Sequence, residues 1–174
     1  MKKLLLLPIL FFAISTSCQE IPQLKLSRDG IKPIIVEVKG MKAPEIYNNA
    51  LNWVQEYYNT PDYVLKANIP NKKIRVNGLE KNAWWYKALG SKMYYDIEYN
   101  LEISFKEGKY RFYIDIKNAN SVGTGYKTFF KKKTGKVKRA AKDAVPSLEK
   151  TINNLSLSFY NYVTGKTVTK DEDW

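Results

Sequence analysis

Three carboxylates that could take part in catalysis lie close together in the chain: Asp96, Glu98 and Glu102. Side chains an even number of residues apart point to the same side of a β-strand, so the three acids would share one face. A glycoside hydrolase needs two such groups flanking a cleft, one of them with a raised pKa. Apolar residues alternate with these acids, however, which predicts that the acids face solvent beside Arg111 and Lys117. We therefore interpret them as solvated cross-strand charges.

Composition excludes several other kinds of catalytic site. The chain has 174 residues, no His and one Cys. Without an imidazole there is no Ser-His or Cys-His nucleophile pair and no His-ligated metal, and one Cys forms no internal disulfide and no Cys zinc site. The run Asp171-Glu172-Asp173 could attract a hard cation such as Ca²⁺, but it falls in a predicted frayed tail without fixed geometry. The sequence thus predicts no metal, no cofactor and no catalytic residues, and indicates that the protein is not an enzyme.

A basic segment, residues 127–142, is the strongest anomaly in a chain with 29 Lys and Arg against 17 Asp and Glu. Clustered lysines attract phosphates by about 1 kcal/mol each near an anionic surface. Tyr126, Phe129 and Phe130 stand at its start and could insert into an interface. The alternative is a solvated loop that keeps the protein soluble. The segment has no acidic residue, and its eight basic ones are the candidate anionic-surface site: Lys127, Lys131, Lys132, Lys133, Lys136, Lys138, Arg139 and Lys142.

Three consecutive aromatic residues form a second anomaly: Trp84, Trp85 and Tyr86. They could pack in the core or at a sheet edge. They could instead form an exposed aromatic platform for a sugar or a partner. Solvent accessibility distinguishes these two interpretations.

The N-terminus has the three-part layout of a secretory signal. Two lysines follow Met1, residues 4–14 carry no charge, and small polar residues lead to Cys18. Eleven residues are too few for a permanent membrane-spanning helix, which needs about 20. We expect residues 1–17 to be a signal peptide and the protein to be exported.

Cys18, directly after the small residues, resembles the lipobox cysteine of bacterial lipoproteins. The resemblance implies cleavage before Cys18, a diacylglyceryl thioether on its sulfur and an acylated amino group, which together anchor a protein stably. Ser15 stands where the lipobox usually has Leu, and Ser15 and Ser17 also suit ordinary signal peptidase, so a soluble secreted protein is the alternative. Gln19 follows, rather than the Asp that retains lipoproteins in the inner membrane of enteric bacteria. By that analogy we expect the protein to be anchored in the outer membrane, on either its periplasmic face or its outer face.

Residues 18–33 are predicted to be the lipidated Cys and a tether, because residues 19–33 hold two prolines, one glycine and no apolar periodicity. A single domain should follow at residues 34–165, with a tail at 166–174. Apolar spacing predicts a strand at residues 34–39, a helix from Pro44, strands at residues 65–69 and 72–88, and a last helix ending before Gly165. The helix positions expected to be buried are Ile46, Ala50, Val54, Tyr57, Leu148, Ile152, Leu155 and Phe159.

The clearest element is a hairpin around Glu107-Gly108, whose strands alternate apolar and polar residues. A two-residue turn pairs Lys106 with Lys109. That register puts Ile103 opposite Phe112 on a buried face. The other pairs that it predicts are Phe105 with Tyr110, Leu101 with Ile114, Glu98 with Lys117 and Ser104 with Arg111.

The predicted order is β-α-β-β-β-β-α. With the sequences EIYNNALNW at residues 45–53 and YNLEISFKEGKYR at residues 99–111, the chain resembles the bacterial domain-of-unknown-function family 4468 over roughly residues 34–118. The resemblance implies a fold like that of the TATA-binding protein (TBP-like): an α+β domain with an antiparallel sheet of about five strands and two helices on one face. Where the family tends to a Gly-rich strand, this chain keeps only Gly78. A fold likeness to a DNA-binding protein does not imply a DNA function, and we expect no nucleic-acid partner.

These observations predict a lipid-anchored cell-envelope protein whose small domain is a non-enzymatic binding or assembly module of unknown ligand. The expected partners are the membrane, through the lipid anchor, and anionic lipid or lipopolysaccharide, or another envelope protein. The alternatives are an envelope hydrolase that uses Asp and Glu carboxylates, and a soluble secreted protein.

Overall fold

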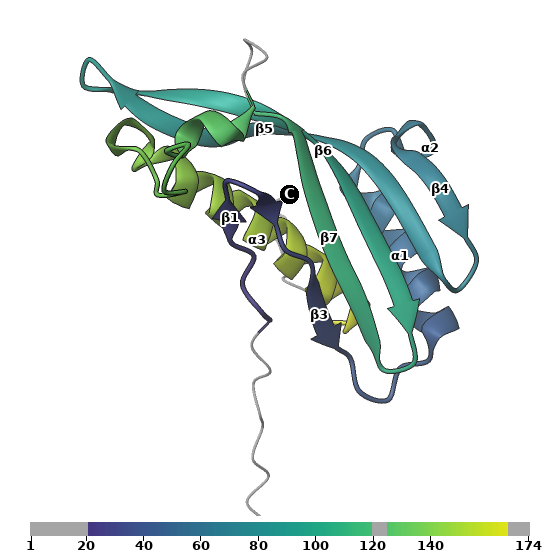
Figure 1. Cartoon of the computed structure of the whole chain (residues 1–174). Coiled ribbons are helices and arrows are strands. Elements are labelled where there is room, and N and C mark those ends of the chain that lie inside the picture. The colour runs from purple at the N-terminus through teal and green to yellow at the C-terminus, as the bar shows by residue number, and fades with distance from the viewer. Residues whose placement is uncertain (1–20, 120–124, 167–174) are drawn as a thin grey trace, which may run out of the picture.

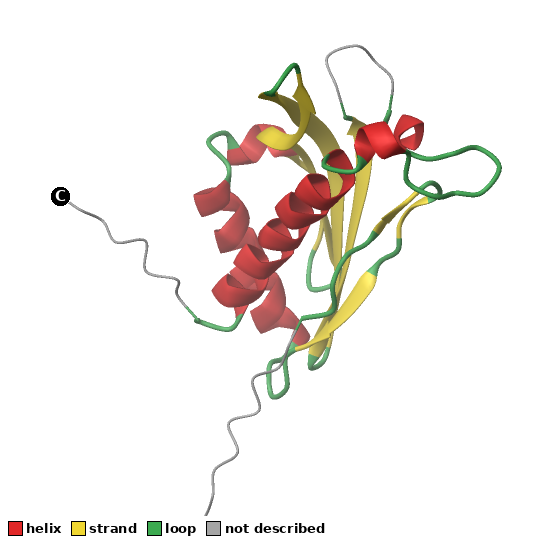
Figure 2. Cartoon of the chain, turned by 90° about the vertical axis from the view of Figure 1, so that its left-hand side faces the viewer, coloured by secondary structure: helices red, strands yellow, loops and turns green. Residues whose placement is uncertain are grey.

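A long antiparallel hairpin forms the centre of the sheet in the computed structural model, which describes residues 21–119 and 125–166. Its strands are β6 (Ser91–Lys106) and β7 (Lys109–Asn118). The five-stranded sheet has the order β3-β7-β6-β5-β4, and both long helices cover the same face (Figures 1 and 2). The predicted α+β architecture and element order are confirmed. The other strands of this sheet and the α-helices are β3 (Ile34–Glu37), α1 (Ala43–Tyr57), α2 (Pro61–Val64), β4 (Leu65–Ile69), β5 (Lys73–Ala88) and α3 (Ala144–Val163).

The core lies between the sheet and the two long helices. Alternate residues are buried in β7 and, from Ile97 onward, in β6, while the residues between them are more exposed, as period-two patterning requires. From the helix side, α1 and α3 meet where the Trp53 and Phe159 rings pack edge to face, with centroids 5.1 Å apart. Trp53 is buried, whereas Tyr57 is 37% exposed, so the buried stripe of α1 is rotated from the predicted one. No helix in the described ranges is long and apolar enough to cross a membrane.

The hairpin register is as predicted on the buried face: Ile103 lies opposite Phe112, and the neighbouring apolar pairs match too. Ser104 also lies opposite Arg111. The predicted pair of Glu98 with Lys117 is wrong, because a register shift between Glu98 and Tyr99 places Glu98 opposite Asn118. A bulge inserts one extra residue into a strand and moves every later pair by one position.

The described part of the predicted tether, residues 21–33, packs against the domain, which corrects the prediction that these residues form a free linker. Leu24, Leu26 and Ile31 are buried, and residues 26–31 form a small hairpin of β1 (Leu26–Ser27) and β2 (Gly30–Ile31). The Leu24 backbone N–H donates to Asn153 Oδ1 on α3 at 2.8 Å. Sequence periodicity misses this segment because each strand is only two residues long. The predicted signal peptide, Cys18 and all of the predicted tail except Lys166 lie outside the described residues.

The helix α3 protects the outer edge of β5. Strand β4 pairs only with the first residues of β5, up to Val76, so the rest of that edge has no strand partner. Two side chains of α3 bind it instead: Thr151 Oγ1 donates to the Ala83 carbonyl at 2.6 Å, and Ser147 Oγ accepts from the Trp85 backbone N–H at 3.1 Å. Covering an edge in this way prevents pairing with another chain. It also fixes the first half of α3 against the bulged part of β5.

Candidate functional site

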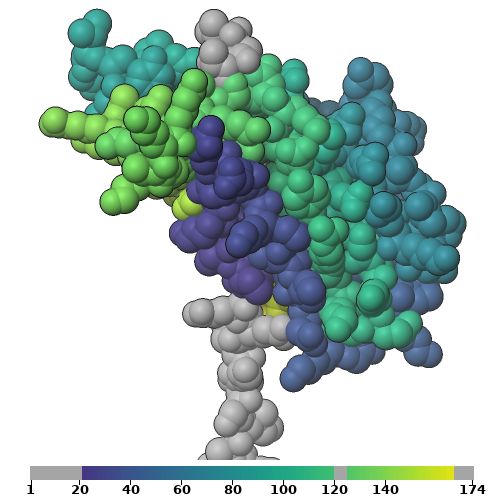
Figure 3. All heavy atoms as spheres, in the orientation of Figure 1, coloured from purple at the N-terminus to yellow at the C-terminus, as the bar shows by residue number. Residues whose placement is uncertain are grey.

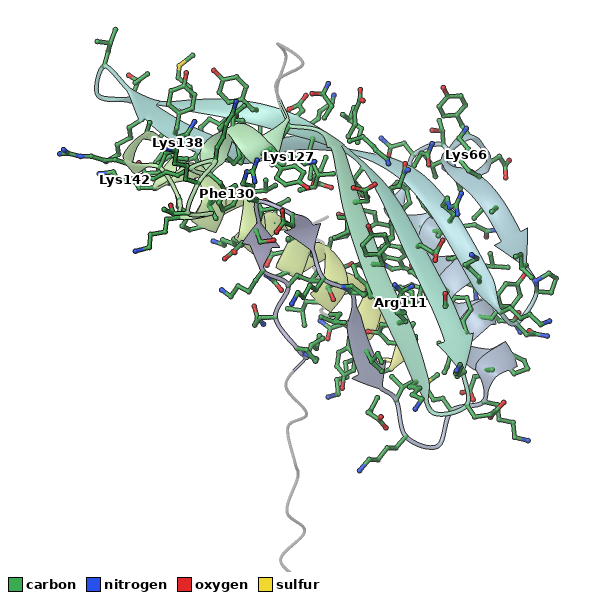
Figure 4. The ribbon with its side chains drawn as sticks, in the orientation of Figure 1. Lys66, Arg111, Lys127, Phe130, Lys138 and Lys142 are labelled. Atoms are coloured by element: carbon green, nitrogen blue, oxygen red, sulfur yellow. The ribbon has the colours of Figure 1, made fainter. Side chains whose placement is uncertain are left out.

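The basic segment is anchored in the core by its aromatic residues. Tyr126, Phe129 and Phe130 are all less than 10% exposed, so the expectation that they insert into an interface is wrong. Tyr126 and Phe129 lie in a 3₁₀ turn (Tyr126–Phe129), and Phe130 forms a β-bridge with Val137. Residues 131–136 therefore form a loop whose base is fixed by the bridge between Phe130 and Val137 (Figure 4).

All eight basic side chains of the segment are exposed. The ion pairs among the described residues involve other cations, and none of the eight takes part in one. The loop backbone is nevertheless defined: the Lys131 N–H donates to the Lys136 carbonyl at 2.8 Å, and the Lys138 N–H donates to the Phe129 carbonyl at 2.8 Å. Figure 4 shows Lys138 and Lys142 close together at one end of the molecule, whereas Lys127 lies nearer the middle of the view. The arrangement presents a cluster of uncompensated positive charge.

The three candidate carboxylates do not form a catalytic pair in a cleft. Asp96 Oδ1 accepts a hydrogen bond from the Asn82 backbone N–H at 2.8 Å and stabilises a bulge in β5. Glu102 binds Lys73 and Arg75 on the sheet face opposite the helices. Partial burial alone would raise the pKa of Glu102, but hydrogen bonds from Arg75 and Lys73 hold it below its ordinary range. A general acid requires the opposite shift.

Two other acids of the sheet, Glu98 and Asp115, also lie in open surroundings, because Glu98 is exposed and Asp115 is partly exposed. Glu98 borders a shallow hollow of about 320 Å³ beside Leu79 and Tyr94. Asp115 Oδ2 accepts from Lys117 Nζ at 2.5 Å. No three His, Cys, Asp or Glu side chains in the described residues gather as metal ligands would.

The three consecutive aromatic residues do not form one platform. Trp84 is 4% exposed, its indole N–H donates to the Ala119 carbonyl at 2.6 Å, and it stacks on Tyr95 with centroids 4.6 Å apart. Tyr86 is half-buried against the same cluster. Trp85 is half-buried too, but it lies at a groove between β5 and α3, with Lys92 Nζ 4.5 Å from the centroid of its ring. Alternation along β5 separates neighbours onto opposite faces, so at most Trp85 is offered to a ligand.

A cluster of tyrosines with one carboxylate lies at the end of α1, and sequence reasoning missed it. The Tyr57 hydroxyl donates to Glu80 Oε2 at 3.2 Å, and the Tyr58 and Tyr99 hydroxyls are 2.9 Å apart. Burial raises the pKa of Glu80, although the hydrogen bond from Tyr57 opposes the shift. Burial likewise raises the pKa of the Tyr99 phenol. The cluster holds no second acid, so it provides no pair of carboxylates for catalysis. The hydrogen bond from Tyr57 holds the Glu80 side chain next to the bulge of β5.

Two further lysines join the basic surface, and sequence reasoning missed them because they lie on other elements. Lys92 comes from β6 and Lys150 from α3, and both line a groove of about 520 Å³ together with Lys142 of the basic segment. Their separation in the sequence gives no signal that they meet. Elsewhere, a groove of about 880 Å³ runs between α1 and α3 beside Trp53, Tyr57 and Leu157.

Sheet order and helix placement define an α+β domain with a five-stranded antiparallel sheet and both long helices on one face. Residues 34–117 match the family model "Domain of unknown function (DUF4468) with TBP-like fold", which confirms the resemblance that the helix and hairpin motifs indicate. No curated protein matches the chain.

Two solved structures share the fold. One is a TBP-like protein from Parabacteroides distasonis ATCC 8503, with a TM-score of 0.54 and 16% identity over 76% of this chain and 90% of that one. The other is a DUF4468 family protein from Bacteroides ovatus ATCC 8483, with a TM-score of 0.53 and 14% identity over 83% of this chain and 88% of that one. At these identities the likeness shows the fold alone.

Proposed function

We propose that this protein is a lipid-anchored component of the bacterial cell envelope whose α+β domain binds anionic membrane surfaces without catalysing a reaction. One observation carries the proposal: eight exposed cations, unpaired within the described residues, project from a loop with a buried aromatic base. Such a cluster attracts phosphates strongly, because none of its eight cations forms an ion pair with a carboxylate of the described residues.

The packed N-terminal segment supports a position close to the bilayer. Cys18, the proposed lipidation site, precedes Ile21 by three residues, and Ile21 packs against the core. Three residues span at most about 10 Å. A domain held on so short a linker stays within reach of the head groups, where lysine attraction is strongest, since the Debye length is about 10 Å at 0.1 M salt.

The anchor can be tested by replacing Cys18 with Ser and fractionating the cells. We expect the wild type in the membrane pellet with incorporated labelled palmitate, and the variant in the soluble fraction. If the wild type takes up no palmitate, the lipoprotein proposal is wrong. A soluble wild type would then favour the secreted alternative, whereas pelleting of both proteins would indicate another mode of attachment.

Surface binding can be tested with the chain from Gln19 onward, which keeps every described residue and the whole core. We expect it to bind phosphatidylglycerol vesicles at low salt and to be released at 1 M salt, where the Debye length falls to about 3 Å. Changing six residues of the basic segment to Gln should abolish binding with little change in melting temperature, because all six are exposed: Lys131, Lys132, Lys133, Lys136, Lys138 and Arg139.

A matched control removes the same charge from distant sites: Lys39, Lys42, Lys66, Lys72, Lys106 and Lys109 changed to Gln. This variant should keep most of the binding if the cluster matters, and lose as much as the first variant if only net charge matters. Should the wild-type chain ignore anionic vesicles at low salt, the basic segment is a solvated loop, and another envelope protein becomes the expected partner.

A further inference from the structure

A groove between β5 and α3 has the walls of a preformed site. Its floor and sides come from the bulged part of β5, the start of β6 and the first three turns of α3, and its volume is about 520 Å³. Most of the lining residues are exposed, so the groove would hold a small head group at the surface and would not enclose it. The residues that line it are Asn82, Ala83, Trp85, Lys92, Lys142, Asp143, Pro146, Ser147, Lys150, Thr151 and Asn154.

Hydrogen bonds to the backbone hold these walls in place. Thr151 and Ser147 bind the Ala83 carbonyl and the Trp85 N–H of β5, and Asp96 binds the N–H of Asn82. Asn82 has a φ of 53°, an unusual value for a non-glycine residue, which the bulge imposes. Because these bonds fix the backbone on both sides, a ligand would have to order the lysine side chains but not the backbone of the groove.

The charges that line the groove favour a dianion. Lys92, Lys142 and Lys150 contribute three ammonium groups, none of which is ion-paired among the described residues, and Asp143 contributes one carboxylate. The balance is two positive charges. A phosphate monoester carries about −1.5 to −2 charges at pH 7, whereas the phosphodiester of an ordinary phospholipid carries only one. Lys92 also lies over the Trp85 ring, which holds its ammonium group at the rim.

The groove also lies next to the path of the N-terminal segment. Lys150, Pro146 and Asn154 line it on one side, and the same three residues line a second hollow that residues 21–25 border. We propose that the groove binds the phosphate-monoester head group of a membrane lipid, while the basic segment supplies unselective attraction. This inference rests on the proposed function, because the short linker to Cys18 is what brings lipid head groups to α3.

The test compares two lipids at matched surface potential, with the chain from Gln19 onward. Phosphatidic acid presents a phosphate monoester, and phosphatidylglycerol presents a diester. We expect at least fivefold tighter binding to phosphatidic acid. The double variant Lys92→Gln/Lys150→Gln should lose this preference, while its binding to phosphatidylglycerol should weaken no more than the loss of two charges from the basic segment would weaken it. The control Lys132→Gln/Lys133→Gln should bind both lipids more weakly and keep the preference.

The outcomes separate the groove from the basic segment. Equal binding of the wild type to the two lipids would overturn the inference and leave the proposed function intact. If Lys92→Gln/Lys150→Gln keeps the preference for phosphatidic acid, the phosphate monoester does not bind in this groove, and the inference is wrong. If the chain binds neither kind of vesicle, both the proposed function and the assignment of the groove to a lipid head group are wrong. A titration of backbone amide shifts with glycerol 3-phosphate covers that case: saturable shifts at Ala83 and Trp85 would reassign the groove to a soluble phosphate ester, and no shifts would reject it.

Discussion

Replacing Gly78 with Ala should destabilise the domain, because the ring of Tyr99 occupies the space that a methyl group would need. Gly78 lies directly opposite Tyr99 in the pairing of β5 with β6. A Cβ at position 78 would lie 2.6 Å from Tyr99 Cε2 and 2.5 Å from its hydroxyl oxygen, closer than Cβ contacts are found. Tyr99 is 1% exposed, so its ring has no free space into which it can move.

The cost can be worked from the contacts that must change. Overpacking a core costs about 1–3 kcal/mol. Moving the Tyr99 ring also breaks its 2.9 Å hydrogen bond to the Tyr58 hydroxyl, a loss of about 0.5–1.5 kcal/mol. Ala regains about 0.5–1 kcal/mol over Gly through lower backbone entropy in the unfolded chain. The net loss is about 2 kcal/mol, or about 4–8 °C in melting temperature for a chain of this length.

Thermal and urea unfolding of the chain from Gln19 onward would measure this difference. Gly125→Ala is the matched control: an added Cβ there has nothing within 4 Å and its φ of −56° suits any residue, so its stability should stay within about 0.5 kcal/mol of wild type. In a Tyr99→Leu background, where the ring is gone, adding Gly78→Ala should cost little. Equal melting of Gly78→Ala and Gly125→Ala, or strictly additive effects of Gly78→Ala and Tyr99→Leu, would refute the packing argument.

Three other substitutions test the partly buried acid Glu80, the edge of β5 that α3 covers, and the hairpin register. Burial raises the pKa of Glu80 above its ordinary value of 4.5, so the folded state holds this proton more tightly than the unfolded chain, and stability should fall as pH rises through the folded pKa. Glu80→Gln should remove that part of the fall in urea midpoint with pH, and an unchanged dependence of the midpoint on pH would contradict it. Thr151→Val removes the hydroxyl that binds the Ala83 carbonyl and should cost about 1 kcal/mol in urea unfolding while hydrogen exchange in β5 speeds up; unaltered exchange there would speak against edge protection. Ile103→Asp loses a buried side chain, worth about 2–5 kcal/mol, and buries a charge, so circular dichroism should show an unfolded chain, whereas Glu102→Gln should stay folded; equal melting of these two variants would disprove the register.

Local patterns in the sequence were sufficient to predict the order of the long elements and the pairing of the central hairpin. The pairing of Ile103 with Phe112 follows from a two-residue turn and strict alternation, both of which act over a few residues. The buried stripe of α3, including Leu148 and Phe159, follows from helical periodicity in the same way. These features need no knowledge of distant parts of the chain.

The candidate site depends on long-range packing, which local patterns do not record. The burial of Phe130 follows from the fold beneath the loop, and the packing of Leu24 follows from a partner on α3 that is 129 residues away. Lys92 and Lys150 meet only because α3 covers the edge that β4 leaves open.

The amino-acid sequence by itself determined the α+β class, the hairpin register on its buried face and the positive charge of the basic segment, because alternation, turn type and composition are properties of neighbouring residues. The tertiary structure alone decided the rest: Trp84 enters the core while Trp85 borders the groove, and Gly78 is required by the ring of Tyr99. The physical reason is that burial, close packing and the meeting of like charges depend on which distant elements share a surface.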